Sequence, residues 1–145
     1  ADDLGNSWSS AVQMTDLKGT EYDAALYEYE GVYYFGYTSS SQGGMLVTSS
    51  DDGLDWDEEH ERLAVTGFHP HFIELDDTLA IVYAGFNNMY AVFLEDYGWS
   101  EPVMVLEDVP YQAYPVIMDE RLGFTFAYDL NNERDIFFSW SESTR

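Results

Sequence analysis

The chain of 145 residues contains no cysteine, which excludes disulfides, thiolate metal ligands and cysteine nucleophiles. Basic residues are also scarce, because Lys and Arg total five against 28 Asp and Glu, and Lys18 is the sole lysine. Nucleic-acid binding needs Lys and Arg to neutralise phosphates, so we expect no nucleic-acid partner. No apolar run approaches the length of a membrane span and no signal peptide is visible, so we expect no membrane partner.

The net charge of −23 comes from acidic residues that are spread along the chain rather than massed in one block. This distribution predicts a solvated acidic shell, which suits high salt because screening weakens the self-repulsion. The expected setting is the cytoplasm of a salt-accumulating organism or a saline extracellular medium. The alternative is an acidic surface that recognises a basic partner. Hydrophobic residues make up 46% of the chain and aromatic residues 17%, so it is long and apolar enough to fold around a core.

Three aromatic, apolar segments resemble one another and recur about every 45 residues, at 32–37, 79–84 and 122–127. Each follows a short apolar segment and an acidic turn, and each precedes a polar loop and another apolar segment. Helical periodicity is absent, and turn residues separate the runs. Four strands per repeat predict an all-β protein built from the four-stranded antiparallel blades of a β-propeller. Blade one is expected at about 21–65, blade two at 67–108 and blade three at 112–145.

A turn motif of the form Ser-x-Asp-x-Gly-x-x-Trp is formed by Ser49, Asp51, Gly53 and Trp56. Gly53 can adopt a left-handed backbone, and the side chains of Ser49 and Asp51 are expected to bond the N–H groups of the turn. Trp56 is expected to open the next strand and to fold its ring over the hairpin. Shortened or altered copies of the motif contain Asp96, Gly98 and Trp99, and Asp3, Gly5 and Trp8.

This motif resembles the Asp-box, the bacterial neuraminidase repeat of sialidase-like β-propellers. The resemblance covers the repeat architecture of nearly the whole chain, but only the box itself is specific. Sialidase catalysis in that family requires an arginine cluster, a Tyr–Glu pair and an acidic proton donor. The chain has only Arg62, Arg121, Arg134 and Arg145, and none is expected on an innermost strand, so we expect no sialidase activity.

Three blades are too few to close a ring, because known propellers have at least four. The third repeat ends at Arg145 before any box, whereas residues 1–13 match the outer strand of a blade. We therefore expect a two-fold symmetric homodimer with a six-bladed ring, the blade number of the sialidase-like fold. In this dimer, residues 1–13 of one chain complete blade three of the other. The alternative is that the chain is a fragment whose remaining blades lie on the same natural polypeptide.

The loops that enter the innermost strands, and those between second and third strands, are expected on one face of the propeller. Aromatic, amide and imidazole side chains gather there, whereas the box face collects acids. Rings stack on sugar faces and amides bond hydroxyls, so this face suits a neutral polyhydroxy ligand such as a carbohydrate. The alternative is that these residue types only form turns and strands. The candidate ligand-binding residues are Tyr22, Asp23, His69, His71, Asn87, Tyr111, Tyr114, Asn131 and Arg134.

His69 and His71 would share a face of a regular strand, but Pro70 makes regularity at this strand entry doubtful. Two imidazoles without a third ligand do not make a metal site, so we expect no metal and no cofactor. The sequence therefore predicts a non-catalytic module that binds carbohydrate or another polar ligand at the ring axis. One alternative is a glycoside hydrolase-like enzyme that uses inner-strand carboxylates, with Asp23 as its candidate residue. Another is a purely structural or assembly domain.

Overall fold

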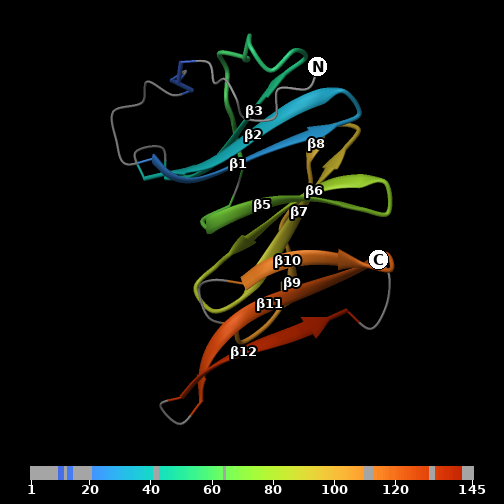
Figure 1. Cartoon of the computed structure of the whole chain (residues 1–145). Coiled ribbons are helices and arrows are strands. Elements are labelled where there is room, and N and C mark those ends of the chain that lie inside the picture. Colours follow the sequence, from blue (N-terminus) through green and yellow to red (C-terminus); the bar gives the residue numbers. More distant parts are fainter. Residues whose placement is uncertain are drawn as a thin grey trace.

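A computed structural model of the chain describes residues 10–11, 13–14, 21–40, 43–63, 65–109, 113–130 and 133–141. These residues form twelve β-strands in three antiparallel sheets, and the described part of the chain contains no helix (Figure 1). The expected all-β class is thereby confirmed. Accordingly, the described residues include no helix long and apolar enough to cross a membrane.

Each sheet is built from strands that are consecutive in sequence, as the repeats predict. The first sheet has the order β1-β2-β3-β4 and the third β10-β11-β12, whereas in the second β8 and β9 both pair with β7 after β5 and β6. The bounds are β1 Glu21–Tyr29, β2 Val32–Ser39, β3 Gly44–Ser50, β4 Glu61–Arg62, β5 Phe68–Leu75, β6 Thr78–Ala84, β7 Met89–Glu95, β8 Gly98–Trp99, β9 Val103–Leu106, β10 Ala113–Met118, β11 Arg121–Leu130 and β12 Glu133–Trp140.

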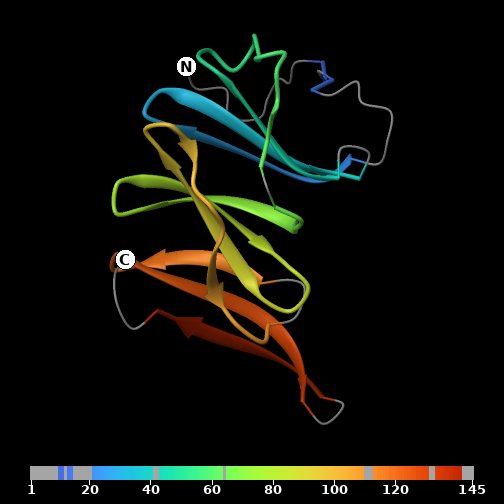
Figure 2. The same cartoon turned by 180° about the vertical axis from the view of Figure 1, so that it is seen from behind.

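The three sheets lie face to face in sequence order, with the second between the first and the third (Figures 1 and 2). Their first strands are neighbours, since β1 contacts β5 and β5 contacts β10. The sheets have four, five and three described strands rather than four each, and their succession around adjacent inner strands resembles that of propeller blades around an axis.

Two apolar layers hold the stack together, one on each side of the second sheet. Side chains alternate along a strand, so β6 directs Leu79 and Ile81 toward the first sheet and Ala80 and Val82 toward the third. The two layers explain why β6 is almost continuously apolar, because both of its faces are buried. The second sheet is therefore the centre of the described structure.

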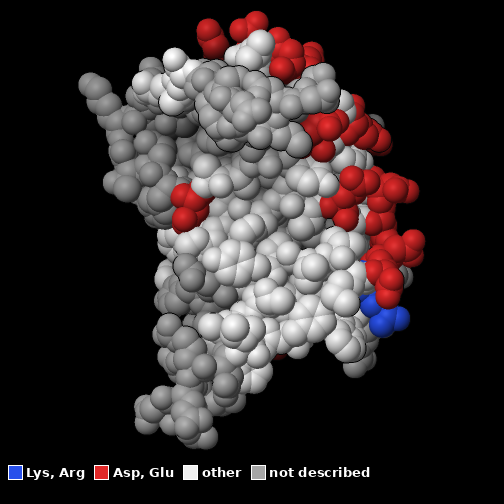
Figure 3. All heavy atoms as spheres, viewed as in Figure 1, with Lys and Arg blue, Asp and Glu red and all other residues white. Residues whose placement is uncertain are grey.

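Acidic residues form the tight turns that join the first two strands of each sheet. Both turn residues have positive φ at Glu30–Gly31, Asp76–Asp77 and Asp119–Glu120, as two-residue hairpin turns of type I′ require. Figure 3 shows acidic side chains along the edge of the molecule where the hairpins β1–β2 and β5–β6 turn in Figure 1. We call this edge the acidic edge.

The Ser-x-Asp-x-Gly-x-x-Trp motif begins at the end of β3 and continues into the loop between β3 and β4, residues 51–60, which is called the box loop here. The Ser50 Oγ accepts hydrogen bonds from the N–H groups of Asp52 (3.3 Å) and Gly53 (2.9 Å) and donates one to the Asp55 carbonyl (2.6 Å). The Asp52 carboxylate accepts bonds from the N–H groups of Leu54 (2.8 Å) and Asp55 (2.9 Å). These backbone bonds lower the pKa of Asp52 below its ordinary value.

The turn bonds therefore belong to Ser50 and Asp52, one residue later than the assignment to Ser49 and Asp51. The reason is the alternation of side chains along β3, which puts Ser50 on the face over which the box loop folds. Ser49 lies on the opposite face of β3, and its hydroxyl donates a hydrogen bond to the Asp57 carboxylate instead (2.7 Å). Gly53 does adopt the expected left-handed backbone, with φ of 73°.

Trp56 folds back over the β2–β3 hairpin as expected, with its ring edge-on to Phe35 at a centroid distance of 6.0 Å. It does not open the next strand, since β4 begins only at Glu61. Further along the loop, the His60 Nδ1 is 2.7 Å from the hydroxyl of Tyr37. The box loop thus covers much of the far face of the first sheet, the face turned away from the second sheet.

The shortened motif at Asp96, Gly98 and Trp99 forms the turn into β8, with Gly98 at a φ of 115°. The ring of Trp99 lies 6.4 Å from the ring of Tyr34 and 6.4 Å from that of Phe72. Trp99 therefore joins the two sheets, because it packs against β2 of the first sheet and β5 of the second. The N-terminal copy at Asp3, Gly5 and Trp8 lies outside the described residues.

Candidate functional site

β-Bulges shape the start of two inner strands. The pairing register shifts between Tyr22 and Ala24 in β1, and between Phe68 and His71 in β5. Asp23 and His69 occupy the bulges with left-handed φ values of 53° and 54°. Each lies six residues before the end of its strand, so the two bulges are equivalent by position. Bulges redirect side chains and are enriched beside functional sites.

The two bulges open onto a small pocket of about 120 Å³, which we call the axial pocket. Its walls come from the inner strands of all three sheets, namely Asp23 and Ala24 of β1, His69, Pro70 and His71 of β5, and Ala113 and Tyr114 of β10. The Asp23 Oδ1 lies 3.2 Å from the His69 Nδ1. The rings of His71 and Tyr114 meet edge to face at 5.4 Å. The pocket thus combines an acid–imidazole pair with an aromatic wall.

His71 is the titratable group whose pKa is shifted in this pocket. Burial lowers the pKa of His71 below its ordinary value, the neighbouring His69 lowers it further, and Asp23 partly opposes them. His71 is therefore neutral at neutral pH. A neutral imidazole has one N–H donor and one acceptor nitrogen, so it can bond a hydroxyl group in either direction.

Four of the nine predicted ligand-binding residues come together in this pocket: Asp23, His69, His71 and Tyr114. The doubt about strand regularity at Pro70 is resolved, because the strand is bulged and both imidazoles still line one pocket. Ala24, Pro70 and Ala113 also line it, and no signal in the sequence marks these residues as functional. They are small or compact, which leaves room for the polar groups.

The other predicted residues are not placed in this pocket. Asn87 is exposed in the loop between β6 and β7, where its carbonyl accepts a hydrogen bond from Val109 N–H (2.8 Å). Tyr22 is in β1 and Arg134 in β12, but the structure does not describe their side chains, and Tyr111 and Asn131 lie outside the described residues.

The described arginine side chains do not contribute to the axial pocket. Arg62 in the outer strand β4 donates a hydrogen bond to the Gly43 carbonyl (3.0 Å), and Arg121 starts β11 beside the acidic edge. Within the described residues, no group of three or more His, Asp and Glu side chains is placed to hold a metal ion.

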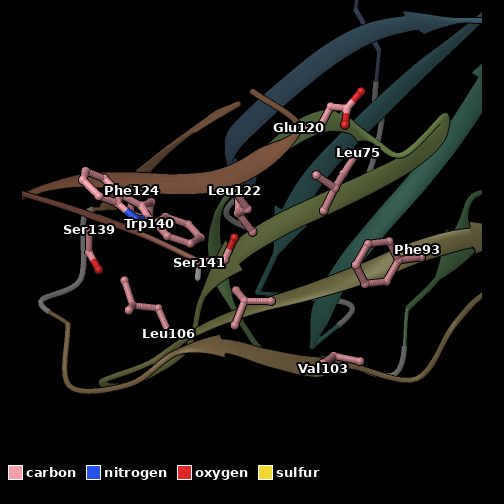
Figure 4. A pocket seen from close by; sticks show the side chains of 11 residues that line it. Leu75, Phe93, Val103, Leu106, Glu120, Leu122, Phe124, Ser139, Trp140 and Ser141 are labelled. Carbon is pink, nitrogen blue, oxygen red and sulfur yellow. The ribbon is translucent and has the colours of Figure 1, made fainter. Parts of the chain in front are cut away.

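A second hollow, the apolar groove, lies between the second and third sheets and has a volume of about 250 Å³. Figure 4 shows Phe93, Leu122, Phe124 and Trp140 among its labelled side chains, and Glu120 lies at its margin. Eight of its eleven lining residues are apolar, and the polar ones are Glu120, Ser139 and Ser141.

No protein-family model matches the chain, and no curated protein sequence matches it either. Among solved structures, the fold is similar to a Bacteroides ovatus protein described as xyloglucan PUL GH43B, with a TM-score of 0.67 and 12% sequence identity. The match covers 86% of this chain and 27% of that protein, so the chain spans about a quarter of its length. This likeness supports a β-propeller fold of the glycoside hydrolase kind, and it concerns the fold alone.

Proposed function

We propose that the chain is a non-catalytic β-propeller module that binds carbohydrate, or another neutral polyhydroxy ligand, at the axial pocket. The observation that carries the proposal is the convergence of Asp23, His69, His71 and Tyr114 from the inner strands of three sheets. A carboxylate and imidazoles bond sugar hydroxyls, and an exposed aromatic ring stacks on the apolar face of a sugar. Tyr114 is exposed beside the polar groups and can make such a contact.

The volume of the pocket limits the ligand. About 120 Å³ is below the roughly 300–1,000 Å³ of pockets that enclose drug-sized molecules. The pocket therefore fits one sugar unit or the end of a longer glycan. Xyloglucan oligosaccharides are the first probe to use, because the similar Bacteroides ovatus protein is described as a xyloglucan PUL protein.

Binding is tested by calorimetry with xyloglucan oligosaccharides in concentrated KCl. Tyr114→Ala is expected to weaken binding about threefold to tenfold, since it removes the stacking ring. Tyr97→Ala is the matched control, because Tyr97 is fully exposed at the turn between β7 and β8, at the other end of the strands. Equal affinity of Tyr114→Ala and the parent chain would contradict the assigned pocket. A lack of glycan binding by the parent chain, extended to a glycan array, would leave the structural or assembly role.

A glycoside hydrolase is the second candidate function, and Asp23 is the residue that favours it. Glycosidases use two carboxyl groups, about 5–5.5 Å apart when they retain configuration and about 6.5–9.5 Å apart when they invert it. Among the described residues that line the axial pocket, Asp23 is the single carboxylate, and His69 already pairs with it. Hydrolysis that is seen with the parent chain and lost in Asp23→Asn would make this candidate the better one.

A further inference from the structure

The third sheet exposes positions that are buried in the other two sheets. The three sheets can be aligned on the turn between their first two strands. In this alignment one position of the third strand is occupied by Met45, Met89 and Ile136, whose partners on the second strand are Thr38, Ala84 and Ala127. Met45 and Met89 are 0% exposed, because the next sheet covers them, whereas Ile136 is 84% exposed. The next equivalent set shows the same trend, with Val47 and Ala91 buried and Phe138 40% exposed. The outward face of the third sheet therefore has the side chains of a sheet-to-sheet interface.

The third sheet also has an open edge in the described structure. In the first two sheets, β4 pairs with β3 and both β8 and β9 pair with β7, whereas β12 pairs with β11 alone among the described strands. An unpaired edge is a template for another strand.

The apolar groove lies where a tryptophan of such a strand would be inserted. Between the first two sheets, Trp99 of β8 fills this place beside Tyr34 and Phe72. The same alignment of the sheets shows which residues take these places between the second and third sheets. Ala80 corresponds to Tyr34, and Pro115 corresponds to Phe72. The groove opens beside them, between Phe93, Leu122 and Phe124. Its volume of about 250 Å³ is ample for an aromatic side chain, since a cavity of about 150 Å³ holds benzene.

We propose that a second copy of the chain completes the third sheet, with its residues 1–13 as the fourth strand and its Trp8 in the apolar groove. When the two tryptophans are aligned, Trp8-Ser9 and Val12 repeat Trp99-Ser100 and Val103, which lead from β8 into β9. Trp8 then takes the place of Trp99. Because Trp99 pairs with Leu94, and Ser141 is the counterpart of Leu94 in the third sheet, Trp8 is expected to pair with Ser141.

A second copy accounts for both the open edge of the third sheet and its uncovered outward face, whereas a strand from the same chain accounts for the open edge alone. The chain's own residues 1–13 would extend the edge of the third sheet but leave Ile136 and Phe138 uncovered. A second copy also brings its first sheet, where Leu26 is 61% exposed in the position equivalent to Phe72. Among the described side chains, the outward face of the third sheet includes no acid, whereas Glu28 lies on the same face of β1 as Leu26.

The absence of native cysteine allows a cross-linking test. Ser7 and Glu142 correspond in sequence to Gly98 and Glu95, which pair across β8 and β7. Antiparallel partners lie within disulfide range. A Ser7→Cys chain mixed with a Glu142→Cys chain in concentrated KCl should form a covalent heterodimer under mild oxidation. A Glu101→Cys chain, with an exposed cysteine beside β9, replaces Glu142→Cys as the control and should not cross-link with Ser7→Cys. Cross-linking only within a chain that carries both cysteines would overturn the second-copy proposal.

The mass in solution gives an independent readout. Light scattering in concentrated KCl should report a dimer, and Trp8→Ala should raise its dissociation constant by about a hundredfold or more, as loss of a buried tryptophan implies. Tyr97→Ala should leave the constant unchanged. A monomeric parent chain at every concentration tested would overturn the proposal whatever the variants do.

Discussion

The first and third sheets both present one face away from the second sheet, and they differ in what lies over it. On the first sheet, the box loop places Trp56 against Phe35 and His60 against Tyr37, which is buried. On the third sheet, Ile136 and Phe138 are exposed among the described residues. Stacked repeats need terminal units with a covered or polar outer face. The box loop therefore covers part of the outward face of the first sheet and leaves Leu26 exposed, whereas no described segment covers Ile136 or Phe138 on the third sheet.

The largest expected effect is a difference in unfolding free energy between substitutions at equivalent positions of the second and third sheets. Met89→Ala should lower the free energy of unfolding by about 2–5 kcal/mol, because it leaves a cavity between two sheets. Ile136→Ala should change it by less than about 0.5 kcal/mol at protein concentrations too low for association, because the side chain is exposed. Urea denaturation in concentrated KCl measures both. Similar losses in the two variants would show that Ile136 is covered within a single chain.

A smaller effect is expected where the box loop is anchored to the first sheet. Ser50→Ala should cost about 0.5–1.5 kcal/mol of unfolding free energy, because the buried Ser50 hydroxyl makes three hydrogen bonds to backbone groups of the turn. Ser49→Ala is the matched control and should cost less than about 0.5 kcal/mol, since its bond to Asp57 is exposed. The same denaturation series ranks the two serines. The reverse ranking would return the anchoring role to Ser49.

The smallest effect concerns the acidic residue of the same loop. The folded-state pKa of Asp52 lies below its ordinary value of 3.8, so its contribution to stability is present above that pH and is lost as the pH falls through the folded value. Asp52→Asn lacks this titration. The thermal midpoints of Asp52→Asn and the parent chain should therefore differ at neutral pH and converge in acid. A difference between the two thermal midpoints that stays the same at every pH would show that the charge of Asp52 does not contribute to stability.

The sequence was informative wherever a local pattern sets the backbone. Acidic pairs between apolar runs located the hairpins, and the repeat spacing located the three sheets. It gave the wrong serine for the turn bonds of the box loop. Ser49 and Ser50 are chemically identical, and only the alternation of side chains along β3 decides which of them faces the loop. The bulges at Asp23 and His69 had no signal, since their left-handed backbones arise from the pairing with β2 and β6. The apolar groove depends on how two sheets pack, which no local pattern encodes.

The acidic edge and the axial pocket lie at opposite ends of the same inner strands. Asp23 is six residues from the end of β1, a distance of roughly 20 Å along a strand. Neighbouring hairpin tips carry like charges at a sheet spacing of roughly 10 Å, close to the Debye length at about 0.1 M salt. At low ionic strength the carboxylates of neighbouring tips would repel one another and lower the stability of the stacked sheets. Concentrated salt would screen this repulsion and remove that cost.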